Sequence, residues 1–350
     1  MLAAQLVTSR MIEINEVDKP SFGMASILIK VKFTAICGTD LNIYRNASNV
    51  DLPRTLGHEI TGIVADKGEN VTRVEIGDRV VVDPVYFCGQ CQLCSEGKSY
   101  LCPKGGLLGR ESDGGFAEYV VVNEINVFKI PEDISFAEAT QIQTLSTIYH
   151  SQKRLHVEPG KSIMVVGMGV TGLLHVQLAK ASGATPIVAV DVFQSKLELA
   201  KKFGADVAIK VPDSSAIDKI RNTTRGKGPS AVIEAVGIPS TVSLSMESVA
   251  SGGKVLLFGV GHQPFTGWDP YMIYLKELNV VGTRAASNID WQPSIDLVEN
   301  SSINLKPLVT HILPLQDVQK AFAVMDEGGE GVIRVVVEMP EKSEVSTKQV

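Results

Sequence analysis

The amino-acid sequence predicts an α/β fold in two parts, a mainly β domain and a doubly wound parallel-sheet domain. The chain has 350 residues, and a chain of this length usually divides into two domains with separate hydrophobic cores. Residues 1–80 read as short alternating runs such as SILIKVKFTAI, which are typical of antiparallel strands. From residue 161 onward, continuous apolar runs such as SIMVVG and PIVAVD alternate with helical segments. That alternation indicates βαβ units and a parallel sheet buried on both faces.

Composition and charge limit the classes of molecule that this protein is expected to bind. The chain is 44% hydrophobic with a formal net charge of −6, and its Lys and Arg residues form no cluster with interleaved aromatics. We therefore expect neither nucleic acid nor anionic membranes as partners. Charged residues such as Arg10 and Glu13 interrupt the first twenty positions, and no apolar run reaches the length of a membrane span. These features predict a cytoplasmic protein.

The β domain is interrupted by a cysteine-rich loop and ends in a helical segment. Strand signals resume after the loop at GGFAEYVVVN and NVFKIP. The hydrophobic period then becomes helical across SFAEATQIQTLSTIYHSQKRL. Ser135 is the expected N-cap of this segment, and Glu138 three residues later completes a capping box.

Four of the five cysteines fall within fifteen positions, at Cys88, Cys91, Cys94 and Cys102. In a reducing cytosol such a cluster is expected to bind a metal rather than to form disulfides. Four thiolates on one loop complete a tetrahedral zinc ion and leave no open position for chemistry. The loop therefore predicts a structural zinc site, with an iron–sulfur cluster as the alternative.

The motif VVGMGVTG follows a predicted strand and opens a predicted helix. Gly167 would make the tight turn, Gly169 would let a pyrophosphate approach the backbone, and Gly172 would let the helix pack on the sheet. Val170 and Thr171 lie between the last two glycines, at the start of the helix. The arrangement predicts a dinucleotide-binding site. The alternative is that these are loop glycines that bind no ligand.

An acidic residue completes this fingerprint. Asp191 ends the next predicted strand, nineteen residues past Gly172. A carboxylate there accepts hydrogen bonds from the ribose hydroxyls of an adenosine and repels a 2′-phosphate. The sequence therefore favours NAD over NADP, and a surface aspartate is the alternative reading.

A second set of candidate metal ligands is spread over two separate segments of the chain. Cys37 lies in CGTD after an apolar strand, and His58 and Glu59 lie in LGHE before another. Cysteine, histidine and carboxylate are the ligands of open catalytic zinc sites, whose remaining position takes water or substrate. Taken singly, these residues are more often ordinary core residues, and their spacing alone does not decide between the two readings.

Taken together, the motifs resemble the zinc-dependent medium-chain dehydrogenase/reductase family, which includes alcohol, sorbitol, threonine and glucose dehydrogenases. The resemblance rests on CGTD, GHE, GDRVVVDP, the four cysteines, GGFAEYV, the glycine motif with its acid, and KPLVTHILPLQDVQKAF. It implies a GroES-like catalytic domain from residues 1–149 and 285–350, with the zinc lobe at 88–102. Residues 150–284 would form a Rossmann NAD-binding domain.

The resemblance also implies a ligand set for a catalytic zinc. Cys37 and His58 would bind directly, and Glu59 would bind or yield to water. The family's alcohol dehydrogenases have a further cysteine where this chain has Gln143, so Gln143 is the expected fourth ligand. Gln141 is the fallback.

Other matched positions carry supporting roles. Thr39 would contact the substrate oxygen and pass its proton, and Asp40 would orient the histidine ligand. Asn42 replaces the family's usual relay histidine, which leaves the exit route of the proton open. Arg334 would pair with the cofactor pyrophosphate, with a solvated strand arginine as the alternative reading.

The implied activity is oxidation of a hydroxyl of a polyol, sugar or vicinal diol, with two zinc ions per chain and NAD. Simple primary and secondary alcohols are the alternative substrates. A non-catalytic NAD-binding zinc protein and a zinc-free reductase are disfavoured, because Cys37, His58, Glu59 and Thr39 are all present. Family members are dimers or tetramers, so a homo-oligomer is expected.

Overall fold

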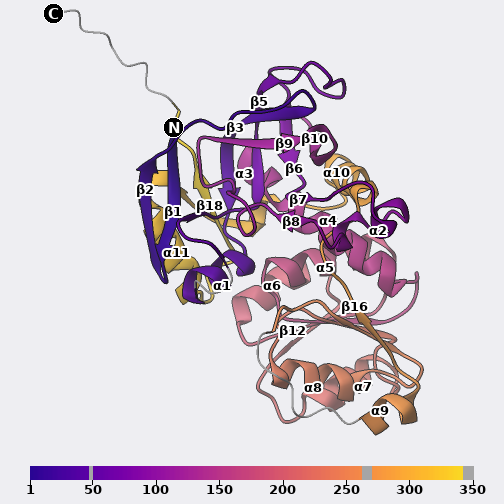
Figure 1. Ribbon diagram of the computed structural model, residues 1–350. Coiled ribbons are helices and arrows are strands. Elements are labelled where there is room, and N and C mark those ends of the chain that lie inside the picture. Colours follow the sequence, from indigo (N-terminus) through magenta and orange to yellow (C-terminus); the bar gives the residue numbers. More distant parts are fainter. Residues whose placement is uncertain (47–49, 262–269, 342–350) are drawn as a thin grey trace, which may run out of the picture. The chain divides into compact units, whose positions relative to one another are not determined.

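The computed structural model describes residues 1–46, 50–261 and 270–341 (Figure 1). They divide into two compact units. The chain passes from the first unit to the second between Gln143 and Thr144, and it returns between Leu308 and Val309, with residues 329–333 again in the second unit. The boundaries predicted from the sequence, 149/150 and 284/285, instead assign residues 144–149, 285–308 and 329–333 to the first domain. Residues 342–350 of that domain lie outside the described residues.

The first unit combines the N-terminal segment with the C-terminal strands. Its elements before the crossing are β1 (Leu2–Thr8), β2 (Met11–Glu16), β3 (Ser26–Ala35), α1 (Gly38–Asn46), β4 (Arg54–Thr55), β5 (Glu59–Lys67), β6 (Arg79–Val82), β7 (Val85–Tyr86), α2 (Gln92–Ser95), η1 (Ser99–Leu101), β8 (Gly106–Leu107), β9 (Tyr119–Asn123), η2 (Glu124–Asn126), β10 (Val127–Lys129) and α3 (Phe136–Ala139). Its elements after the return are β17 (Val309–Pro314), η5 (Leu315–Asp317), α11 (Val318–Glu327) and β18 (Arg334–Glu338).

The larger sheet of this unit has the strand order β10-β6-β5-β3-β18-β17, with β9 also paired to β3. β3 runs antiparallel to both β5 and β18, and Ala35 near its end pairs with Glu59 on one side and Val336 on the other. Because the neighbours are antiparallel, the end of β3 lies beside the starts of β5 and β18. Residues that follow β3 therefore meet residues that begin the other two strands.

The second unit is a parallel sheet with the order β13-β12-β11-β14-β15-β16. This is the Rossmann order, in which the first strand lies beside the second and the fourth. Its elements are α4 (Gln141–Leu155, which begins in the first unit), β11 (Ile163–Val166), α5 (Val170–Ala181), β12 (Ile187–Asp191), α6 (Gln194–Lys202), β13 (Val207–Lys210), α7 (Ala216–Thr223), β14 (Ala231–Glu234), α8 (Pro239–Ser248), β15 (Lys254–Leu257), α9 (Pro270–Lys276), β16 (Asn279–Gly282), η3 (Asn288–Asp290), α10 (Trp291–Glu299) and η4 (Lys306–Leu308).

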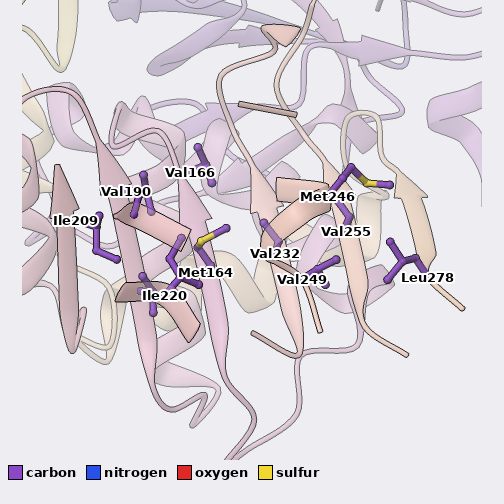
Figure 2. Close-up of a cluster of buried hydrophobic side chains, with 12 residues drawn as sticks. Met164, Val166, Val190, Ile209, Ile220, Val232, Met246, Val249, Val255 and Leu278 are labelled. Carbon is purple, nitrogen blue, oxygen red and sulfur yellow. The ribbon is translucent and has the colours of Figure 1, made fainter. Parts of the chain in front are cut away.

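The apolar strand residues of the second unit form its core, as the sequence pattern predicts. Figure 2 shows Met164 of β11, Val190 of β12 and Val232 of β14 in a cluster with Ile220 of α7 and Met246 of α8. Each of the strand residues is fully buried. The antiparallel and parallel sheets together confirm the predicted α/β class.

The capping box predicted at Ser135 is confirmed. The Ser135 hydroxyl accepts a hydrogen bond from the Glu138 backbone N–H, and the Glu138 carboxylate accepts one from the Ser135 N–H. The helical segment it starts is divided at Thr140 into α3 and α4. Among the described residues, no helix has the length and apolar character needed to cross a membrane.

Candidate active site

The strand register of the first unit brings three predicted metal ligands together. Cys37 follows the end of β3, whereas His58 and Glu59 stand at the start of β5. Ligand atoms of these three residues all lie within 4.8 Å of one another. His58 and Glu59 are buried and Cys37 is half-buried. Thiolate, imidazole and carboxylate at this separation fit a zinc ion with a further position for substrate.

Asp40 contacts two residues of this cluster, His58 and Cys37. The carboxylate is fully buried; one oxygen lies 3.3 Å from Nδ1 of His58 and accepts a hydrogen bond of 3.1 Å from the Gly57 N–H. The other oxygen accepts a hydrogen bond of 2.9 Å from the Cys37 N–H. A carboxylate on Nδ1 fixes the ring so that Nε2 is the nitrogen left for a metal.

The same residues make the site attractive to a cation. Burial lowers the pKa of His58, but the Asp40 carboxylate and Cys37 outweigh it and hold this pKa well above its usual value. Negative charge around the imidazole therefore stabilises a bound positive charge, whether a proton or a metal ion.

Arg334 joins three segments of the site. Its guanidinium lies 3.1 Å from the Glu59 carboxylate and donates hydrogen bonds of 2.8 Å to the Ile36 carbonyl and 2.9 Å to Oε1 of Gln141. Arg334 is 1% exposed, which excludes the solvated strand arginine considered from the sequence. Its role at the cofactor pyrophosphate stays a prediction.

The two candidate glutamines differ in their surroundings. The Gln141 amide receives the Arg334 hydrogen bond on its oxygen and donates one of 2.8 Å to the Thr140 hydroxyl with its nitrogen. Both ends of this side chain are therefore used inside the protein, which makes it a poor fallback ligand. Gln143 is buried one half-turn later on α4, and its role as fourth ligand stays a prediction.

The first turns of α1 carry the remaining predicted catalytic positions. Thr39 is half-buried, two residues beyond Cys37. Asn42 lies one turn later, and both its backbone carbonyl and its Oδ1 accept hydrogen bonds from Nδ2 of Asn46, at 3.2 and 3.1 Å. The asparagine amide is thus engaged within the helix, and it offers no group that titrates near neutral pH.

Replacing Asn42 with His tests whether proton exit limits turnover. A histidine here provides a titratable group, so we expect kcat to rise about threefold or more, with a new dependence on pH near the histidine pKa. Steady-state kinetics between pH 5 and 9 measures this. Asn46→His, one turn further along α1, is the matched control and should show neither effect. Unchanged kcat and pH profile in N42H would mean that proton exit is not limiting.

The four clustered cysteines have the geometry of a single-metal site. Their closest Sγ to Sγ distances are 3.5 Å for Cys91 to Cys94 and for Cys102 to Cys88, 3.8 Å for Cys91 to Cys102, and 4.0 Å for Cys88 to Cys94. A tetrahedron with zinc–sulfur bonds of about 2.3 Å has edges of about 3.8 Å. The match favours one ion over an iron–sulfur cluster, which holds its cysteines around several irons.

Neighbouring groups shift the pKa of two of these thiols in opposite directions. Hydrogen bonds from the Gln90 backbone and Cys102 lower the pKa of Cys88 to about 6, whereas burial and the neighbouring Cys91 raise that of Cys94 to about 12. Four adjacent thiolates repel one another, and a divalent ion removes that repulsion.

Replacing Cys91 with Ser should remove about one zinc per chain and lower the midpoint of thermal unfolding by about 5 °C or more. A zinc ion held by four ligands of one loop is expected to stabilise that loop, while the chemistry is proposed to lie at the Cys37 cluster. Metal analysis and calorimetry measure both quantities. Ser95→Ala in the same loop is the matched control. A C91S protein with unchanged metal content and unfolding midpoint would contradict a structural zinc.

The glycine motif forms the expected turn between β11 and α5. Gly167 has φ of +93°, and a Cβ on Gly172 would come within 1.7 Å of the Gly167 carbonyl oxygen. Gly169 is the N-cap of α5, and a Cβ there would meet no atom within 4 Å. The turn therefore leaves open space at the N-terminus of a twelve-residue helix, where backbone N–H groups favour a phosphate.

Asp191 is tied to this turn. One carboxylate oxygen accepts a hydrogen bond of 2.5 Å from the Met168 N–H, and the other accepts one of 2.8 Å from the Phe193 N–H. Asp191 also ends β12, the strand beside β11. The carboxylate is thus held next to the glycine turn, as a ribose-binding acid requires.

The chain is similar to known proteins over most of its length. Residues 23–132 match the protein-family model for the alcohol dehydrogenase GroES-like domain, and residues 170–300 match the family model for zinc-binding dehydrogenase. L-threonine 3-dehydrogenase of Bacillus velezensis is 34% identical, over 92% of this chain and 94% of its own. Sorbitol dehydrogenase of Bacillus subtilis is 33% identical over 92% of both chains. The solved structure of galactitol-1-phosphate dehydrogenase from Escherichia coli has a TM-score of 0.89 at 27% identity, covering 97% of this chain and 100% of its own.

Proposed function

Because the chain belongs to the zinc-dependent medium-chain dehydrogenase/reductase family, we propose that it oxidises a hydroxyl of a polyol, sugar or vicinal diol to a carbonyl by hydride transfer to NAD. It is an oxidoreductase that acts on CH–OH groups. The observation that carries the proposal is the buried cluster of Cys37, His58 and Glu59, whose donor atoms lie within 4.8 Å of one another.

The residues of the first unit have distinct roles in this reaction. Cys37 and His58 hold the catalytic zinc, Glu59 binds it or gives way to water, and Gln143 is the fourth ligand. A zinc ion in this site supplies Lewis acidity, which lowers the pKa of a substrate hydroxyl toward neutrality. Thr39 accepts the hydroxyl proton and passes it on.

The second unit binds the cofactor. The backbone around Gly167, Gly169, Val170, Thr171 and Gly172 receives the pyrophosphate at the start of α5. Asp191 receives the adenosine ribose and disfavours a 2′-phosphate, which makes NAD the preferred cofactor. Arg334 is proposed to pair with the cofactor pyrophosphate.

The second zinc and the assembly complete the proposal. Cys88, Cys91, Cys94 and Cys102 hold a structural zinc, so the loaded protein should contain about two zinc ions per chain. We further propose a homodimer or homotetramer, on the basis of the family resemblance, and a cytoplasmic location. Light scattering of the purified protein measures the assembly.

A substrate screen with metal analysis tests the activity. The zinc-loaded protein should reduce NAD with at least one of sorbitol, L-threonine, galactitol-1-phosphate or 2,3-butanediol, and lose this activity on chelation and regain it on adding Zn²⁺. Higher kcat/KM for ethanol or 2-propanol than for every polyol, sugar and diol would favour the alternative of simple alcohols. A folded protein with two zinc ions that reduces NAD with none of these compounds would contradict the proposal.

A further inference from the structure

Glu234 is a buried carboxylate on a central strand of the second unit's sheet. It is the last residue of β14, which lies beside β11 in the sheet. The strand order reverses between these two strands, and ligands of such sheets bind outside the carboxyl ends of the strands at that point. Glu234 is 1% exposed, so its charge must be stabilised by hydrogen bonds.

The side chain of Glu234 organises the loop that follows β14. Its Oε1 accepts hydrogen bonds of 2.9 Å from the N–H groups of Val236 and Gly237, and one of 2.7 Å from the Thr241 hydroxyl. Hydrogen bonds to a carboxylate are stronger than those to a neutral acceptor. One oxygen thus joins the loop at 235–238 to the first turns of α8.

The backbone of Glu234 holds a second loop. Its carbonyl accepts hydrogen bonds of 2.9 Å from the N–H groups of Phe258 and Gly259, directly after β15. The two loops touch through glycines, because a Cβ on Gly259 would come within 2.2 Å of the Gly237 nitrogen. A single residue therefore connects both loops at the carboxyl ends of β14 and β15.

The loop after β14 also reaches the glycine turn. A Cβ on Gly167 would come within 2.4 Å of Cγ2 of Val236. In a Rossmann sheet the half that contains the first two strands binds the adenosine, and the other half binds the second mononucleotide. The loops that Glu234 connects belong to the second half, whereas Asp191 belongs to the first.

We propose that Glu234 is a positioning residue that shapes the binding surface for the nicotinamide half of the dinucleotide. The proposal rests on the dinucleotide use proposed above. Glu234 acts through the loops at 235–238 and 258–261 and need not touch the cofactor. A positioning role predicts a loss of affinity that is confined to one half of the ligand, which general destabilisation of the unit would not produce.

The test compares NADH with ADP, which carries the adenosine and the pyrophosphate but no nicotinamide. Glu234→Ala should weaken NADH binding about tenfold or more, because three hydrogen bonds to the carboxylate are lost, and should change ADP binding less than about threefold. Glu234→Gln retains an acceptor oxygen and should restore most of the NADH affinity. Fluorescence titration of NADH and calorimetric titration of ADP measure these constants on the zinc-loaded protein.

Two further variants keep the test decisive. Thr241→Val removes one of the three donors with little change in shape, and should weaken NADH binding about threefold even if E234A does not fold. Asp206→Ala is the matched control, since its carboxylate accepts the Ile187 N–H at the opposite ends of the strands. It should leave the NADH to ADP affinity ratio unchanged.

The outcomes separate this inference from the proposed function. Wild-type NADH affinity in E234A, or in T241V when E234A does not fold, would overturn the role of Glu234 alone. Equal losses of NADH and ADP affinity would overturn it as well, because they would show general damage to the unit. A wild-type protein that binds ADP and NADH with equal strength would remove any nicotinamide contribution, whereas one that binds neither would reject the dinucleotide function itself.

Discussion

Replacing Cys37 with Ala should lower kcat by about a thousandfold or more while leaving NADH affinity within about threefold of wild type. A free alcohol has a pKa far above neutral pH and is almost never ionised there, so the reaction needs a Lewis acid to lower this pKa. We propose that Cys37, His58 and Glu59, whose ligand atoms lie within 4.8 Å of one another, hold that Lewis acid. The dinucleotide motif lies in the other compact unit. Steady-state kinetics, NADH titration and zinc content, which should fall by about one per chain, measure the effect.

The two cysteine sites provide reciprocal controls. C37A should have a much lower kcat and an unchanged midpoint of thermal unfolding. C91S should have a lower midpoint of thermal unfolding and an unchanged kcat per folded molecule. Glu59→Gln should reduce kcat less than C37A, because a ligand that alternates with water is more dispensable than a permanent one. Full dehydrogenase activity in metal-free C37A would end the zinc-dependent mechanism.

Replacing Asp191 with Gly and Val192 with Arg should lower the ratio of kcat/KM for NAD to that for NADP by about a hundredfold or more. The change removes a carboxylate that repels a 2′-phosphate and adds a cation that pairs with it. Val192 is 50% exposed, so an arginine there can be accommodated without entering the core. Initial rates with each cofactor measure the ratio.

Asp191→Asn separates charge from shape in this prediction. It keeps an acceptor for one of the backbone N–H groups of Met168 and Phe193 and removes the negative charge, so it should relax the preference without reversing it. A wild-type enzyme that reduces NADP faster than NAD at equal concentration would show that Asp191 does not select the cofactor.

The sequence alone determined those features whose interacting residues are close together along the chain. The turn from β11 into α5 could be predicted because a tight turn, an approaching phosphate and a packed helix each need glycine at a particular step. The metal site of the four cysteines could be predicted for the same reason, since one short segment brings their Sγ atoms together. The capping box at Ser135 and Glu138 belongs to the same class.

Only the tertiary structure decided which distant residues meet. Spacing along the chain could not show that Cys37 meets His58 and Glu59, because that depends on the antiparallel register of β3 with β5. The bonds of Arg334 to Glu59 and Gln141 depend likewise on β18 lying on the other side of β3. Periodicity marks which face of a strand is buried, but many pairings bury the same face, and packing of the whole unit selects one of them.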